Sequence, residues 1–155
     1  MPDQTLSAAL EREHQEVDAG IDAFLAKLDA GSVDSAALSA TLDFLRRHIY
    51  IEERILFPPI RHGGLVMSLF VMMREHGEIW RAMEALDAEL AGEADPDKLR
   101  ETCGQLVTLL QAHNMKEEPV IYPAADTGLT AEQSAALADF IETGLTPDSW
   151  VCQEA

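Results

Sequence analysis

Two histidine–glutamate pairs with identical spacing are the residues of this sequence best suited to metal chemistry. His48 and Glu52 form one H-x-x-x-E motif, and His113 and Glu117 form the second, 65 residues further along. Side chains four residues apart share one face of a helix, so each pair can aim at one interior point. A single pair of this kind is more often a solvated contact on a helix surface. Repetition of the motif favours two halves of one metal site.

A lone histidine precedes each pair and completes an internal repeat. Residues 12–16 and 74–78 both read R-E-H-x-E, 62 residues apart, which places His14 and His76 in equivalent positions. Each half of the chain is therefore expected to form one helical hairpin. The candidate ligands are His14, His48, Glu52, His76, His113 and Glu117. Four terminal imidazoles and two bridging carboxylates suit a pair of transition-metal ions.

Long helices are needed to position these residues, and the composition favours them. Ala, Leu and Glu dominate, and runs of β-branched residues are absent from the sequence. Glycines and prolines predict helices at about residues 5–30, 34–57, 65–91, 96–118 and 130–143. Apolar residues recur along them at alternating steps of three and four, as in helices that pack at a shallow angle. We expect an all-α fold: an antiparallel up-down-up-down four-helix bundle with a short fifth C-terminal helix.

The expected helices bring the candidate ligands to one level of the bundle. At 1.5 Å per residue, the four histidines lie roughly 21–26 Å from the loop of their own hairpin. Burying carboxylates and imidazoles without a cation costs several kcal/mol, against a typical total stability of about 5–15 kcal/mol. Bound cations remove this cost. We expect one bundle domain, residues 1–143, followed by a tail, residues 144–155.

Charge and composition exclude several classes of protein. The 155 residues carry a formal net charge of −17, which repels nucleic acid. The first residues lack the basic and apolar segments of a secretion signal, and no apolar run is long enough to span a membrane. Cys103 and Cys152 are far apart and form no C-x-x-C motif, which favours free thiols. We expect a monomeric cytoplasmic protein with no nucleic-acid or membrane partner.

The motifs resemble the hemerythrin-like, or HHE cation-binding, domain family over about residues 6–123. The resemblance implies a non-haem di-iron centre, oxo- or hydroxo-bridged, that reacts with dioxygen. The four histidines would be terminal ligands, and Glu52 and Glu117 would bridge two iron ions. Oxygen-carrying members have a further histidine one turn after the third-helix histidine, where this sequence has Trp80, and their last motif ends in Asp. Both irons would then be open to a small molecule.

Several functions remain compatible with this resemblance. The first is binding of dioxygen or a related small molecule, in oxygen or iron binding, sensing or storage. The alternative is a di-iron enzyme that acts on peroxide or nitric oxide, of the detoxification or iron–sulfur repair type. A third is a structural or regulatory bundle with zinc, manganese or no metal. Trp80 could wall off the iron pocket or simply pack in the core. Asp18, one turn after His14, could be an extra metal ligand or could accept a hydrogen bond from that histidine.

Overall fold

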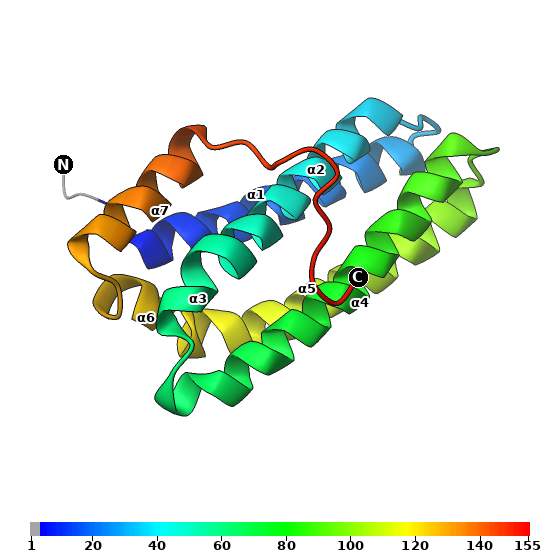
Figure 1. Cartoon of the computed structure of the whole chain (residues 1–155). Coiled ribbons are helices and arrows are strands. Elements are labelled where there is room, and N and C mark those ends of the chain that lie inside the picture. The colour runs from blue at the N-terminus through cyan, green and yellow to red at the C-terminus, as the bar shows by residue number, and fades with distance from the viewer. Residues whose placement is uncertain (1–3) are drawn as a thin grey trace.

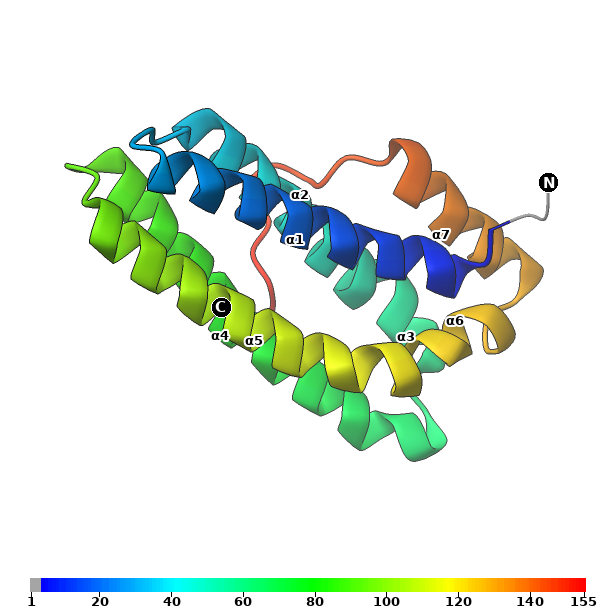
Figure 2. The ribbon, with the colours of Figure 1, turned by 180° about the vertical axis from the view of Figure 1, so that it is seen from behind.

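Four long helices form an antiparallel bundle in the computed structural model, which describes residues 4–155 (Figure 1). The first hairpin consists of α1 (Leu6–Asp29) and α2 (Ser35–Ile51), and the second of α4 (Val66–Ala91) and α5 (Pro96–Val120). α1 also packs beside α5, and α2 beside α4, so the two hairpins close into a bundle (Figure 2). The expected all-α four-helix bundle is confirmed.

Side-chain caps fix the points at which these helices begin. The side chains of Thr5, Asp34 and Asp95 each accept a hydrogen bond from a backbone amide in the first turn of the following helix. Gly31 follows α1 with a φ of 90°, a conformation that L side chains rarely adopt. The loops that contain Gly31 and Asp95, one in each hairpin, lie at the same end of the bundle (Figure 1).

The second helix departs from regular α-helix at the glutamate of the first pair. α2 ends at Ile51 and continues as a π-helical turn, η1 (Glu52–Leu56), and then as α3 (Phe57–Ile60). Pro58 and Pro59 have no amide hydrogen for α-helical bonding, and the Phe57 amide donates to the carbonyl of Glu52, five residues back. The prolines therefore lie in the first turn of α3, which begins at Phe57, whereas the sequence predicted that they end the helix. The wider turn buries both Glu52 and its neighbour Glu53.

Shorter elements close the other end of the bundle. A 3₁₀ turn, η2 (Gly63–Leu65), leads into α4, and α5 continues past Pro119, which lies inside it. α6 (Tyr122–Thr127) was not expected from the sequence, whereas α7 (Ala131–Thr143) is the expected fifth helix. α7 packs on α1, α2 and η1. Across residues 4–155, no helix is both long and apolar enough to traverse a lipid bilayer.

The apolar core consists of two clusters separated along the bundle axis. The cluster nearer the hairpin loops includes Phe24, Leu42 and Leu106, and the cluster at the opposite end includes Leu10, Phe57 and Tyr122. α1, α2 and α4 contribute residues to both clusters, whereas α5 contributes to the first and Ile121 and Tyr122, just after its end, contribute to the second. The candidate metal ligands occupy the layer between them, so the core itself positions the site.

The C-terminal tail, residues 144–155, packs along α2 and α4 (Figure 1). The Trp150 ring lies edge-on against Tyr50 and Trp80, with ring centroids 5.0 and 5.5 Å apart. Cys152 is buried in the same cluster, and its thiol is free. The Gln153 amide donates to Glu53 at 3.0 Å. The tail is therefore part of the packed structure, next to the candidate site.

We expect Gly77→Ala to displace this tail and to destabilise the fold. A Cβ atom at Gly77 would overlap the backbone carbonyl oxygen of Glu154, and a backbone atom cannot move aside without moving the chain. Overpacking of this kind costs about 1–3 kcal/mol. Urea unfolding should show the loss, and limited proteolysis should cut the tail faster than in the natural protein.

Gly104→Ala is the matched control for this substitution. Gly104 lies within α5, and a Cβ atom there would meet no other atom within 4 Å. Alanine in an exposed helix is about 0.5–1 kcal/mol more favourable than glycine, so this variant should gain stability. Equal stabilisation by both substitutions would contradict the packing of the tail against α4.

Candidate metal centre

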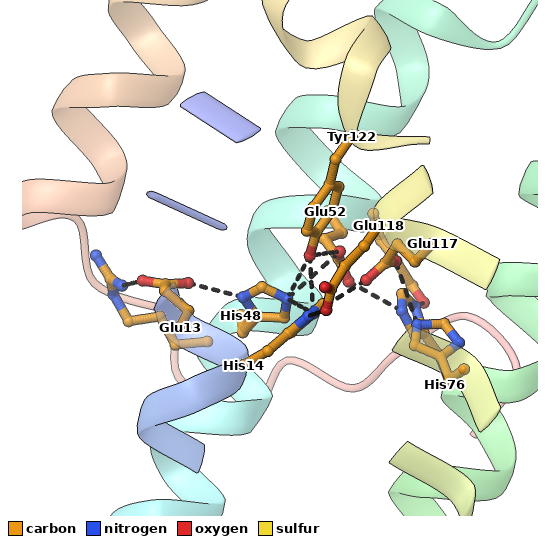
Figure 3. A network of polar contacts seen from close by, with 11 residues as sticks. Glu13, His14, His48, Glu52, His76, Glu117, Glu118 and Tyr122 are labelled. Atoms are coloured by element: carbon orange, nitrogen blue, oxygen red, sulfur yellow. Dashed lines mark hydrogen bonds and ion pairs between the residues drawn. The ribbon is translucent and has the colours of Figure 1, made fainter. Parts of the chain in front are cut away.

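The six side chains singled out by the repeat converge in one buried layer of the bundle (Figure 3). His14, His48, Glu52 and Glu117 each offer one ligand atom, and these atoms lie within 4.8 Å of one another. Glu52, His76, His113 and Glu117 form a second set by the same criterion. The two glutamates belong to both sets. The arrangement is therefore two adjacent four-residue groups that share their carboxylates.

The hydrogen bonds within this layer leave several oxygen and nitrogen atoms of the candidate ligands without a partner, so that they are free to bind a metal ion. Within residues 4–155, Glu52 Oε1, Glu117 Oε1 and His76 Nε2 are buried polar atoms without a hydrogen-bond partner. Glu52 Oε1 lies 3.1 Å from His76 Nε2, and Glu117 Oε1 lies 3.1 Å from His14 Nε2, in directions that form no hydrogen bond. Buried polar groups are almost always satisfied. These three atoms all belong to the two four-residue groups, so a pair of cations fits this site.

Each of the four histidines is oriented by a further glutamate, which is not a candidate ligand and belongs to a neighbouring helix. The Nδ1 atoms donate to carboxylates at 2.7–3.0 Å, which leaves Nε2 directed at the centre. The four partnerships are His14 with Glu118, His48 with Glu13, His76 with Glu53, and His113 with Glu75. They run from helix to helix around the whole bundle. Such carboxylates fix the ring tautomer and raise the basicity of the ligand nitrogen.

The repeat contains a signal for these four glutamates. Each of them is the chain neighbour of a candidate ligand: Glu13 and Glu75 precede the lone histidines, and Glu53 and Glu118 follow the glutamates of the pairs. The motifs R-E-H and E-E therefore carry the ligand and the orienting group together. Sequence reasoning used these neighbours only to support the repeat and assigned them no role.

The carboxylates determine the protonation of the histidines in the metal-free protein. Burial lowers the pKa of His113, but Glu117 and Glu75 outweigh it and raise that pKa to about 10. The same balance raises the pKa of His48 well above its usual range, through Glu52 and Glu13. For Glu75, the hydrogen bond to His113 is the largest influence and lowers the pKa to about 2. The binding of a metal ion must therefore displace protons from the site.

We expect Glu75→Gln to weaken metal binding by about 10–100-fold, the usual effect of removing a carboxylate that orients a ligand histidine. Glu75 accepts from His113 Nδ1 at 2.9 Å and also binds the Lys116 ammonium group. Glutamine keeps the shape but loses the charge that supports His113. Competition with a coloured chelator measures the change. Glu78→Gln, at an exposed position of the same helix, is the control and should bind metal normally.

Tyr122 enters the site from the end opposite the hairpin loops, and sequence reasoning gave it no role (Figure 3). Its hydroxyl donates to Glu52 Oε2 at 2.8 Å and lies 2.8 Å from His14 Nε2 and 3.1 Å from His48 Nε2. The residue is completely buried. Burial, and then the carboxylates of Glu117 and Glu52, raise the pKa of Tyr122 well above its usual range.

Different residues line the space among the ligands and the surface groove outside His14. The narrow space among the ligands is bordered by four apolar residues and one polar residue: Leu45, Ile49, Ile79, Leu110 and Asn114. Outside His14, a groove of about 450 Å³ is lined by residues that include Asp18 and Met115. Trp80 packs against Trp150 and the Arg46 guanidinium and does not border the inner space. Its packing role is therefore the one that the structure supports.

Comparisons with known proteins agree with this geometry. The sequence model of the Hemerythrin HHE cation binding domain matches residues 5–125, which is most of the chain. The iron-sulfur cluster repair protein YtfE of Yersinia pseudotuberculosis serotype IB (strain PB1/+) is 32% identical over 104 residues, or 61% of this chain and 47% of the relative. YtfE of Yersinia pestis (strain Pestoides F) is 31% identical over the same extent.

The matched region is about half the length of these curated relatives. No solved structure gives a significant match. The match of the family model covers both hairpins and every candidate ligand. The chain therefore belongs to the hemerythrin HHE cation-binding domain family.

Proposed function

We propose that the layer between the two core clusters holds two iron ions. His14 and His48 would bind one ion, His76 and His113 the other, and Glu52 and Glu117 both. The observation that carries this proposal is the pair of four-residue groups, each within 4.8 Å, that share both carboxylates. Iron supplies redox-active, Lewis-acidic centres to such a site, with an oxo or hydroxo bridge completing the pair. The carboxylates that accept from the Nδ1 atoms orient the ligand nitrogens toward the ions, and the buried layer excludes bulk water.

The function best supported for this iron site is repair of damaged iron–sulfur clusters, with the protein as a source of ferrous ion. The relatives named above are iron-sulfur cluster repair proteins, and the matched part of this chain amounts to 61% of its length. The matched region is less than half of each relative, so the proposal concerns the iron-binding part of that process. We further propose a monomer that works in the cytoplasm, where ferrous ion persists.

Binding of dioxygen is the second candidate function. Its support is the mostly apolar border of the space among the ligands, where one polar residue, Asn114, accompanies Leu45, Ile49, Ile79 and Leu110. Such a border admits a small uncharged molecule such as dioxygen or nitric oxide and disfavours water. The family resemblance agrees with this reading, whereas the named relatives favour repair.

Metal analysis is the first test of the proposal. Protein reconstituted anaerobically with excess ferrous ion and then desalted should retain two iron ions per chain. His113→Ala should lower both the iron content and the melting temperature of the loaded protein. Retention of fewer than one iron per chain by the natural protein would refute the iron site, and preferential retention of zinc or manganese from a metal mixture would point to a different metal.

A reactivation assay separates repair from dioxygen binding. Loaded protein is mixed anaerobically with a dehydratase whose four-iron cluster has lost one iron. A chelator captures free ferrous ion, and a reductant, present in every sample, supplies the one electron that conversion of the oxidised three-iron cluster requires. Recovery of dehydratase activity, beyond that given by the same amount of ferrous salt, is the expected result. No recovery, together with a long-lived visible absorption after dioxygen is added to the reduced protein, would favour oxygen binding instead.

A further inference from the structure

The internal repeat places an aromatic residue at equivalent positions beside the two halves of the site. Phe57 lies five residues after Glu52, and Tyr122 lies five residues after Glu117. Phe57 stacks on His76 with ring centroids 5.8 Å apart and an interplanar angle of 9°. Tyr122 stacks on His14 at 5.3 Å and 27°. The two halves of the site therefore differ at this position by one hydroxyl group.

That hydroxyl lies where a ligand of the ion beside His14 would lie. Bonds from a metal ion to its ligands are about 2.0–2.1 Å long, so ligands at right angles are about 3 Å apart. Tyr122 Oη is 2.8 Å from His14 Nε2, 3.1 Å from His48 Nε2 and 2.8 Å from Glu52 Oε2. The two histidine nitrogens are themselves 3.1 Å apart. The phenol oxygen thus keeps the spacing of a further member of the same coordination shell.

We infer that Tyr122 is an additional iron ligand, specific to the ion held by His14 and His48. This inference rests on the proposed iron site. Formation of the bond between ferric ion and the phenolate oxygen releases the phenol proton to solvent and requires no change in oxidation state. The ion held by His76 and His113 faces Phe57 and receives no such ligand. The two iron ions are consequently inequivalent, and the position for an incoming small molecule lies on the side of His76.

A purely local role for the hydroxyl is the competing explanation. The Tyr122 hydroxyl donates to Glu52, and this bond alone would satisfy it in the buried interior. A hydrogen-bonded phenol and an iron-bound phenolate differ in one direct property. Only the bound phenolate gives a charge-transfer absorption with ferric ion, and excitation in that band enhances the ring vibrations of the tyrosine in the Raman spectrum.

The experiment uses the ferric, iron-loaded protein, and the sequence makes the assignment simple because it has only two tyrosines. Tyr50 packs against Phe140 and Trp150, away from the candidate ligands. Resonance Raman spectra of the natural protein should contain phenolate vibrations. Tyr50→Phe should keep them at full intensity, and Tyr122→Phe should lose them. Iron content is measured on the same samples.

The outcomes distinguish this inference from the proposed function. Iron-loaded natural protein without phenolate vibrations would overturn the Tyr122 assignment and leave the iron site intact. Vibrations that persist in Tyr122→Phe, or that disappear in Tyr50→Phe, would also overturn it. If Tyr122→Phe fails to retain iron, the natural protein and Tyr50→Phe still decide the question, since only one tyrosine then remains as the source of the signal.

Discussion

Glu117→Gln is expected to abolish binding of both iron ions, so that the iron content falls from two per chain to near zero. Glu117 is completely buried, and its carboxylate belongs to both four-residue groups. Glutamine keeps the volume of the side chain but cannot supply a charged bridge between two cations. His14→Asn should instead remove a ligand from one group only and leave the ion beside His76 bound. Elemental analysis after anaerobic loading and desalting measures both results.

The control for this prediction is Glu101→Gln, at an exposed position earlier on the same helix, α5. It makes the same chemical change and should leave the iron content unchanged. Circular dichroism should show that all the variants remain helical. Loss of a single ion from Glu117→Gln would mean that the carboxylate is terminal and does not bridge the two ions.

Iron affinity is expected to rise by at least about tenfold per pH unit between pH 6 and 8. His113 has a raised pKa of about 10 in the metal-free protein, and the pKa values of His48 and His76 are also raised, because carboxylates outweigh the effect of burial. The His113 imidazole is therefore protonated throughout this range, whereas a ligand imidazole must be neutral. Each proton displaced contributes a factor of ten per pH unit. Anaerobic chelator competition at several pH values measures the slope.

The stability of the metal-free protein should fall as the pH rises, whereas the iron affinity increases. A pKa that is higher in the folded state than in the unfolded state stabilises the fold below the unfolded pKa. This stabilisation is lost as the pH rises through the folded value. For His113 the loss extends from about pH 6.5 to about pH 10. Urea unfolding of metal-free protein across this window should show declining stability. An iron affinity that is flat or falls with pH would contradict the protonation of these histidines.

The bundle and the meeting of the six candidate ligands could be predicted from the sequence because both depend on spacing. The step of four between His48 and Glu52 fixes their shared helix face, and the repeat distance of 65 residues places His113 and Glu117 equivalently. The structure brings these side chains together with His14 and His76 in one layer. Their binding of iron stays a prediction for the metal analysis above.

The remaining features depend either on the detailed backbone bonding of one turn or on contacts between segments that are distant in sequence. The π-helical turn at Glu52–Leu56 arises from local bonding around Pro58 and Pro59, which the sequence suggests only as a helix end. The contact of Tyr122 with His14 joins residues 108 positions apart. The tail lacks periodicity, so its position on α4 follows only from three-dimensional packing at Gly77. Periodicity alone predicts none of these contacts.

The four histidine–glutamate partnerships also determine how the helices are aligned along their axes. An apolar seam repeats every few residues, so on its own it would allow one helix to slide by a turn against its neighbour. Here every boundary between adjacent long helices carries one bond between a buried imidazole and a carboxylate. Sliding any helix by one turn, about 5.4 Å, would break two of these bonds at once. The polar layer thus selects a single register for the whole bundle, even before any ion is bound.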